Sequence, residues 1–103
     1  MNNKVIYIAG PITGVADYKD AFNVTENYLK SKGFTVLNPA SLPSTLTNEQ
    51  AMVIDIGMIN VADAVFFLPN WNESRGAFLE WQYCLYIKKP HFEDMSELLE
   101  AMQ

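Results

Sequence analysis

Short apolar runs alternate with amphipathic segments along the chain, and this alternation predicts the order of the secondary-structure elements. The run KVIYIA at residues 4–9 is rich in β-branched and aromatic residues and is followed by "GP", which is typical of a buried strand ending in a turn. Residues 17–32 place apolar side chains at helical spacing, and Gly33 follows as a C-cap. The next run, FTVLNP at 34–39, predicts a second strand that Pro39 stops.

The second half of the chain continues the alternation after a polar segment, ASLPSTLTNEQ, which is predicted only as a loop. The elements predicted beyond it are a helix at 48–61 capped by Thr47 or Asn48, a buried strand at 62–69, a helix from 73 or 74 to 88, a weak strand at 90–93 and a short amphipathic helix at 94–102.

This order of elements predicts the fold class. Strands that are almost continuously apolar and alternate with helices are typical of a parallel sheet covered by helices on both faces. We therefore expect an α/β protein with a small Rossmann-like or flavodoxin-like parallel sheet of four to five strands flanked by helices. A chain of 103 residues fits one hydrophobic core, so residues 1–103 are expected to form a single domain.

Composition narrows the classes of partner. The net charge of −5 and the pI near 4.6 argue against binding of a nucleic acid polymer, which needs clustered Lys and Arg. The single cysteine, Cys84, lies in an apolar stretch and favours a reducing compartment. The apolar runs are too short for a signal sequence or a membrane span, so a cytoplasmic protein without a membrane partner is expected.

Three segments follow predicted strands and should meet where ligands bind to open parallel sheets, beyond the carboxyl ends of the strands. These are AGPITG, NPASLP and LPNWNESRGA. In the first, Gly10, Pro11 and Ile12 either let the backbone approach a ligand or form an ordinary turn. The loop has neither a GxGxxG nor a Walker A pattern, so binding of ATP or a dinucleotide by those routes is unsupported.

The third segment leads into a helix that contains an acid in apolar surroundings. Ser74 is a candidate N-cap, and the free amides around Gly76 suit a phosphate or a sugar. Glu80 follows in the second turn, between Leu79 and Trp81. It is either a solvated helix acid or a reactive carboxyl whose pKa is raised by its apolar surroundings.

For two aspartates the sequence likewise allows either a role in binding or catalysis or a structural role. Asp55 breaks an apolar run and is a candidate for function, whereas Asp63, just before the third strand, could simply end a helix. The sole histidine, His91, lies far from the candidate loops. No Cys/His cluster of zinc spacing and no Ser/His/Asp set is present in the sequence, so neither a metal nor another cofactor is predicted.

The segments YIAGP (7–11), Asp55, the pair Ala62–Asp63 and the pattern Ser74-x-Gly76-Ala77-x-x-Glu80 occur in an order that resembles a known superfamily. The chain is similar to the nucleoside 2-deoxyribosyltransferase-like proteins, which include nucleoside 5′-monophosphate N-glycosidases. Within them it most resembles small bacterial and phage proteins grouped as a domain of unknown function of the DUF4406 type. The resemblance covers about residues 4–90.

This resemblance implies roles for individual residues. Glu80 would be the nucleophile that attacks the anomeric carbon, Asp55 would hold the sugar or protonate the leaving base, and Tyr7 would orient the nucleophile. The expected activity is cleavage or exchange of an N-glycosidic bond, and the open alternative is a protein that binds or sequesters a nucleotide without turnover. The residues expected to bind substrate are Gly10, Pro11, Ile12, Asp63, Trp71, Ser74 and Gly76.

The expected partners follow from the same considerations. The ligand is a small-molecule nucleoside or nucleotide, and Trp71 could stack on its base. The helix that ends at Lys88 has little polar surface, since Trp81, Tyr83, Leu85 and Tyr86 all lie on it. Such a helix is covered on more than one side, so a homodimer or a larger homo-oligomer is expected.

Overall fold

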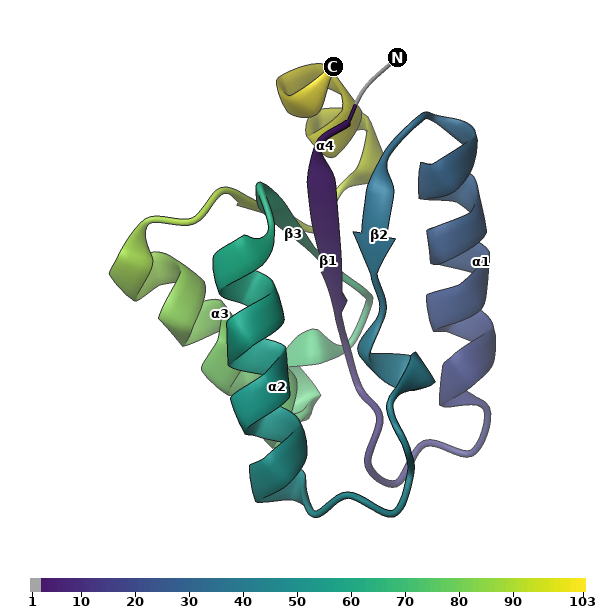
Figure 1. Cartoon of the computed structure of the whole chain (residues 1–103), viewed down its shortest axis with the longest axis vertical. Helices are drawn as coiled ribbons and strands as arrows, with labels where there is room; N and C mark the ends of the chain where they lie inside the picture. The colour runs from purple at the N-terminus through teal and green to yellow at the C-terminus, as the bar shows by residue number, and fades with distance from the viewer. Residues whose placement is uncertain (1–2) are drawn as a thin grey trace.

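The computed structural model describes residues 3–103 and contains a four-stranded sheet in which every neighbouring pair of strands is parallel. The strand order is β2-β1-β3-β4 (Figure 1). The predicted α/β class and the predicted four to five parallel strands are therefore confirmed. The strands are β1 (Val5–Ala9), β2 (Thr35–Leu37), β3 (Ala64–Phe67) and β4 (His91–Phe92).

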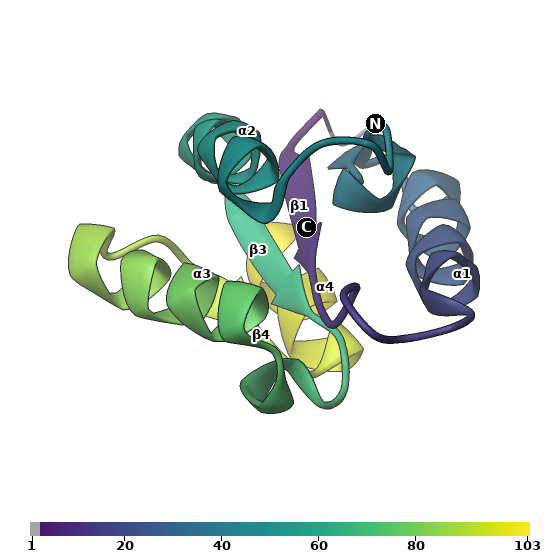
Figure 2. The same ribbon diagram turned by 90° about the horizontal axis from the view of Figure 1, so that it is seen from below.

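Helices cover both faces of this sheet, as predicted. One face packs against α1 (Tyr18–Ser31) and α4 (Met95–Met102), and the other against α2 (Asn48–Val61) and α3 (Arg75–Ile87). Figure 2, in which the strands point towards the viewer, shows the two groups of helices on opposite sides of β1 and β3. Two 3₁₀ turns, η1 (Pro39–Ser41) and η2 (Trp71–Glu73), follow β2 and β3.

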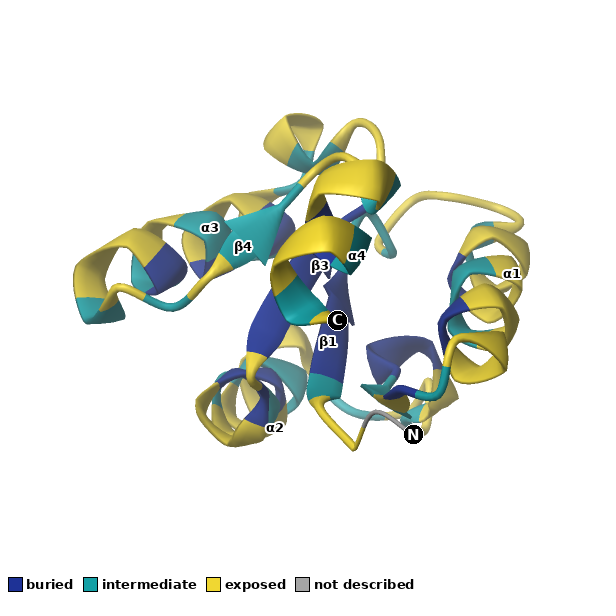
Figure 3. Ribbon diagram, turned by 90° about the horizontal axis from the view of Figure 1, so that it is seen from above, coloured by how far each residue is buried: buried dark blue, intermediate teal, exposed yellow. Residues whose placement is uncertain are grey.

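The two-faced arrangement divides the core into two apolar clusters. Successive residues of β1 point to opposite faces, so Ile6 and Ile8 join one cluster while Tyr7 and Ala9 join the other. Every residue of β3 is also buried, since this strand lies inside the sheet (Figure 3). Tyr7 is thus placed on the α2–α3 face, although its hydroxyl group is polar.

Local sequence signals explain where the helices begin and end. Thr47 caps α2 through a capping box with Gln50, in which each side chain accepts a hydrogen bond from the backbone N–H of the other residue. The Ser74 hydroxyl accepts from the Ala77 N–H and starts α3. After α1, Gly33 adopts a φ of +94°, which only glycine takes up readily.

The predicted strands were too long at their carboxyl ends. The run at 34–39 forms a strand only to Leu37, because Asn38 turns the chain by accepting a hydrogen bond from the Ala40 N–H. The run at 62–69 forms a strand only at Ala64–Phe67. Among the described residues the longest helices have 14 residues, and none is long and apolar enough to cross a bilayer.

Candidate active site

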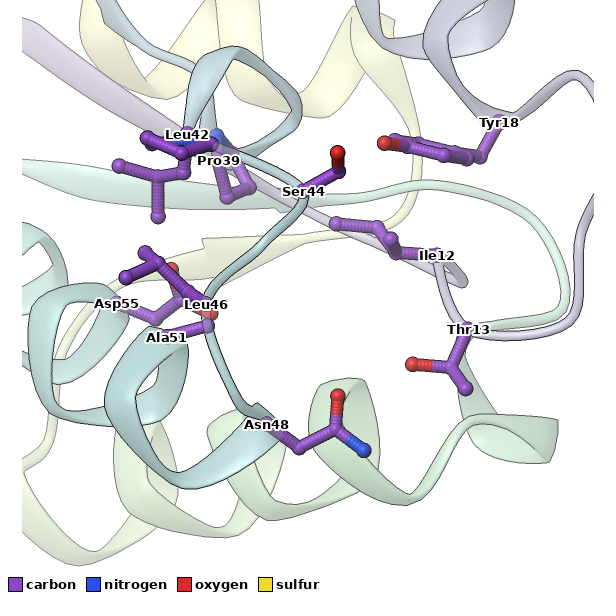
Figure 4. A pocket seen from close by; sticks show the side chains of 11 residues that line it. Ile12, Thr13, Tyr18, Pro39, Leu42, Ser44, Leu46, Asn48, Ala51 and Asp55 are labelled. Carbon is purple, nitrogen blue, oxygen red and sulfur yellow. The ribbon is translucent and has the colours of Figure 1, made fainter.

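A cleft of about 250 Å³ opens where the carboxyl ends of β1 and β2 meet the start of α2 (Figure 4). Its walls come from three parts of the chain: the loop between β1 and α1, the segment after β2, and the first two turns of α2. The lining residues are Ile12, Thr13, Tyr18, Pro39, Leu42, Pro43, Ser44, Leu46, Asn48, Ala51 and Asp55. The position agrees with the rule that ligands bind beyond the carboxyl ends of parallel strands.

Tyr7 and Glu80 form a buried hydrogen bond on the α2–α3 face of the sheet. The Tyr7 hydroxyl donates to Oε1 of Glu80 over 3.0 Å. Tyr7 lies in the central strand β1, and Glu80 reaches it because the Ser74 cap starts α3 six residues earlier. Glu80 is only 4% exposed, so it is not a solvated surface acid.

Asp55 of α2 joins these two residues and connects them to the cleft. Its side chain is 8% exposed and lines the cleft. Its Oδ1 atom is buried and has no hydrogen-bond partner among the described residues. An acceptor left unpaired in a buried position is costly, so this atom is suited to receive a donor from a ligand.

Burial changes the acidity of all three groups. It raises the pKa of Glu80 well above its ordinary value; the charge of Asp55 adds to the rise, and the hydrogen bond from Tyr7 opposes it. Burial also raises the pKa of Asp55 to about 6. The pKa of Tyr7 rises, chiefly by burial and then by the charge of Glu80, so its hydroxyl stays a donor. Two carboxyls held this close retain one proton between them near neutral pH.

Of the three residues predicted to bind substrate in the loop after β1, only one lines the cleft. Ile12 lines the cleft, whereas Gly10 and Pro11 do not. Gly10 instead lies close to Leu68, at the start of the loop that follows β3. A Cβ atom at position 10 would lie 2.9 Å from the Cβ of Leu68. The need for glycine here is therefore explained by packing within the protein.

Ser74 and Gly76 support α3 and do not line the cleft. Ser74 provides the N-cap described above. Gly76 faces α2, and a Cβ atom there would lie 3.4 Å from the methyl carbon of Met52, an ordinary contact distance. Ser74 therefore helps to set where the helix that carries Glu80 begins, and Gly76 lies where that helix contacts α2.

Trp71 lies outside the cleft lining, in an aromatic stack between η2 and α3. Its ring is nearly parallel to that of Trp81, with centroids 4.1 Å apart, and to that of Phe78, with centroids 6.2 Å apart. The indole N–H donates to Oε1 of Glu93. The side chain is thus occupied by contacts within the protein, and its predicted role in stacking on a base has no support from its position.

Asp63 lies at the opposite edge of the sheet, and the structure does not bring it together with the other candidates. Its carboxylate accepts a hydrogen bond of 2.7 Å from the Val5 N–H, and its own N–H donates to the Val5 carbonyl oxygen. Since Asp63 directly precedes β3, it must lie at the amino ends of the strands. It joins β1 to β3 there, and it is not among the residues that line the cleft.

Sequence reasoning found one part of the wall that follows β2 and missed the rest. The predicted segment NPASLP contributes Pro39, Leu42 and Pro43 to the lining, whereas Ser44 and Leu46 of the following loop, and Tyr18 of α1, were not among the candidates. The position of this loop, between the end of β2 and the cap of α2, was the only feature of the sequence that could have indicated its place in the cleft wall. A connection of this kind must cross the carboxyl edge of the sheet, where the cleft lies.

His91 and Cys84 take no part in the cleft lining. The imidazole of His91 contacts the Trp81 ring edge to face, with centroids 4.5 Å apart, and its Nδ1 atom lies 2.8 Å from the Lys89 carbonyl oxygen. Burial raises the pKa of the Cys84 thiol to about 12, so it stays protonated. Both residues have the structural roles that their positions in the sequence predict.

The fold is similar to that of a solved 2-deoxyribosyltransferase from the psychrotolerant bacterium Bacillus psychrosaccharolyticus, described as a biocatalyst for the synthesis of nucleosides. The match covers 84% of this chain and 69% of that one, with a TM-score of 0.67 and 22% sequence identity. At this identity the likeness shows a shared fold.

Comparison with curated protein sequences gives no match. A family model, however, matches residues 4–92, which span β1 to β4 and include Tyr7, Asp55 and Glu80. The chain belongs to the family described as a domain of unknown function, DUF4406.

Proposed function

We propose that this protein cleaves or exchanges the N-glycosidic bond of a nucleoside or nucleotide through a glutamate nucleophile. The observation that carries the proposal is the buried group of Tyr7, Asp55 and Glu80 beside the cleft. Two interacting carboxyls next to a small cleft are what retaining glycoside chemistry requires. The fold that the chain shares with a 2-deoxyribosyltransferase supports the same proposed activity.

Each of the three side chains has its own role in the proposed reaction. The Glu80 carboxylate attacks the anomeric carbon and forms a glycosyl ester, while the bond from that carbon to the base breaks. The proton that the two carboxyls share passes to Asp55 as Glu80 attacks, and Asp55 transfers it to the departing base nitrogen. The Tyr7 hydroxyl holds Oε1 of Glu80 in place during the attack.

The glycosyl ester is then resolved by a second acceptor. If water takes the sugar, the protein is an N-glycosidase, and Asp55, now a carboxylate, takes the proton from that water. If another base takes the sugar, the protein is a transferase. The ester breaks in either case and regenerates Glu80.

One observation favours a second candidate function. Glu80 is only 4% exposed and is not among the residues that line the cleft, whereas Asp55 is. A ligand could therefore bind against Asp55 without reaching Glu80. In that case the protein would bind or sequester a nucleoside-like molecule without turnover.

The test is to incubate the purified protein with nucleosides and 5′-monophosphates, with and without a second free base, and to separate the released bases by chromatography. Replacing Glu80 by Gln keeps its shape and removes the nucleophile, so release should fall at least about 10³-fold. Intact-mass measurement should show a sugar adduct on the wild-type chain and none on Glu80→Gln. Base release that continues at the wild-type rate in Glu80→Gln would exclude the nucleophile assignment.

The binding function gives a different result. A nucleoside would raise the melting temperature of the wild-type chain in proportion to its saturation, with no base released over hours. Asp55→Ala should abolish the shift in melting temperature, because Asp55 lines the cleft.

A further inference from the structure

Most of the basic side chains lie at one edge of the sheet, and acidic side chains predominate at the other. The chain has seven Lys and Arg residues, all within the described part. Five of them lie where strands begin, at the edge opposite the cleft, and Lys89 there donates to the Ala62 carbonyl oxygen just before β3. These five are Lys4, Lys30, Lys32, Lys88 and Lys89.

The edge that carries the cleft is acidic. Besides the buried Asp55 and Glu80, carboxylates stand at the starts of the helices and in the loops that follow the strands: Asp17, Asp20, Glu49, Glu73 and Glu93. The two cations on this side, Lys19 and Arg75, are exposed and are absent from the cleft lining. Asp55 is thus the only one of the lining residues with a carboxyl or a basic side chain.

The start of α2, which borders the cleft, is also poorly suited to an anion. Free amides at a helix N-terminus attract anions. Here the Gln50 N–H already donates to Thr47 Oγ1, and the Thr47 N–H donates to the Gln50 side chain. Glu49 places a carboxylate in the same turn, which opposes a second negative charge.

The neutral lining groups suit a small uncharged molecule. Thr13, Ser44 and Asn48 offer hydroxyl and amide groups for sugar hydroxyls or the edge of a base, and Figure 4 shows them spaced around the opening. Ile12, Leu42 and Leu46 supply apolar surface. The volume of about 250 Å³ lies below the roughly 300–1,000 Å³ of sites for drug-sized ligands.

We infer that the cleft selects an unphosphorylated nucleoside and discriminates against the corresponding 5′-monophosphate. The inference rests on the proposed function and names its substrate class. A phosphate brings nearly two negative charges close to Asp55 and to the acidic edge around the cleft, and the lining contains no Lys or Arg to pair with it. The neutral nucleoside meets no such repulsion.

The experiment compares kcat/KM for matched pairs, a 2′-deoxynucleoside or ribonucleoside and its own 5′-monophosphate, at about 20 mM and about 500 mM salt. The expected preference for the nucleoside is at least about 10-fold to 100-fold at low salt. It should shrink in part at high salt, because the exposed carboxylates of this edge, such as Glu49, are screened over a few ångström there, whereas the buried Asp55 is screened less. An equal or higher kcat/KM for the monophosphate at low salt would overturn the inference and leave the proposed function standing.

A pair of variants at the rim of the cleft tests the cause of the preference. Thr13 is exposed, lines the cleft, and precedes Gly14 in a loop that can accept a longer side chain. Thr13→Lys should lower the ratio of the two kcat/KM values by about 10-fold at low salt. Thr13→Gln has similar length and no charge, so it should leave the ratio near that of the wild type. Equal ratios in both variants would overturn the electrostatic explanation.

Binding separates this inference from the proposed function. If neither compound is turned over, catalysis is excluded, and titration calorimetry with the same pair decides the inference. Tighter binding of the nucleoside supports it; equal or tighter binding of the monophosphate overturns it. A protein that binds neither compound overturns the inference and the proposed function together.

Discussion

The hydroxyl group of Tyr7 lies 3.0 Å from Oε1 of Glu80, although the two residues are 73 positions apart in the chain. This hydrogen bond lowers the pKa of Glu80, against the effects of burial and of Asp55. The bond therefore favours the carboxylate form, which is the form that can attack carbon.

Tyr7→Phe should slow base release and move its pH dependence. Without the hydroxyl donor the pKa of Glu80 rises further, so the acidic limb of the kcat/KM profile should move to higher pH. The loss of a buried hydrogen bond to a carboxyl should also cost about 1–3 kcal/mol of unfolding free energy. A pH-rate profile on both proteins is the measurement. A lower rate with an unmoved acidic limb would show that Tyr7 has only a packing role.

Asp55→Asn should make the protein more stable at neutral pH. The pKa of Asp55 is raised from 3.8 to about 6 in the folded chain, so its contribution is fully present below about pH 3.8 and is lost as the pH rises through about 6. Above pH 6 the charged group is a penalty on the order of 1–3 kcal/mol, which Asn lacks. Urea unfolding from pH 4 to pH 8 should show the two curves separating as the pH rises.

The control for this comparison is Glu49→Gln, which removes an exposed carboxylate from the same helix. Its unfolding free energy should stay within about 0.5 kcal/mol of the wild type at each pH. Wild-type and Asp55→Asn curves that remain parallel from pH 4 to pH 8 would contradict the prediction.

Gly10→Ala should destabilise the fold by about 1–3 kcal/mol, because the new methyl group would lie 2.9 Å from the Cβ of Leu68. The matched control is Gly57→Ala in α2, where a Cβ atom meets nothing within 4 Å. That change should stabilise the protein by about 0.5–1 kcal/mol through helix propensity. Thermal unfolding of both variants tests the contrast, and equal shifts of the same sign would refute it.

Self-association through the outer faces of α2 and α3 is expected. Val53 and Val61 of α2 and Leu85 and Tyr86 of α3 are all more than half exposed, and Tyr86 reaches 86%. Exposed apolar surface over two neighbouring helices is typical of an interface. Tyr86→Glu should lower the mass measured by sedimentation or light scattering to that of the monomer. Val24→Glu, at another exposed apolar position, on α1, should leave the mass unchanged. A monomeric wild-type protein would contradict this expectation.

The sequence was informative where hydrophobic periodicity was interrupted by a charge. Asp55 and Glu80 each stand in an apolar run, and a carboxylate in such a run is either exposed or held in a buried polar group. The structure shows the second case for both residues. The helix that carries Asp55 was predicted with its observed bounds, because a capping residue at Thr47 or Asn48 and the spacing of the apolar positions indicate the same segment.

Side-chain direction and close packing could not be predicted from periodicity. Trp71 follows β3 at the correct edge, yet its ring lies between Trp81 and Phe78, which only tertiary contacts determine. The shape of the cleft depends on the segment from Pro39 to Asn48, whose path is set by turns and by the Asn38 side chain. The position of Asp63 could have been deduced, since a residue that precedes a parallel strand lies at the amino edge.

The central position of β1 has a consequence for the synthesis of the chain. This strand is made before the other three, yet it pairs with β3, and Tyr7 is covered only when Glu80 and Cys84 have followed. A nascent chain that ends after α2 would therefore expose one apolar face of β1 with its strand edge unpaired. Stable packing of this face must wait for α3, because the buried carboxylate pair can form only after Glu80 has been added to the chain.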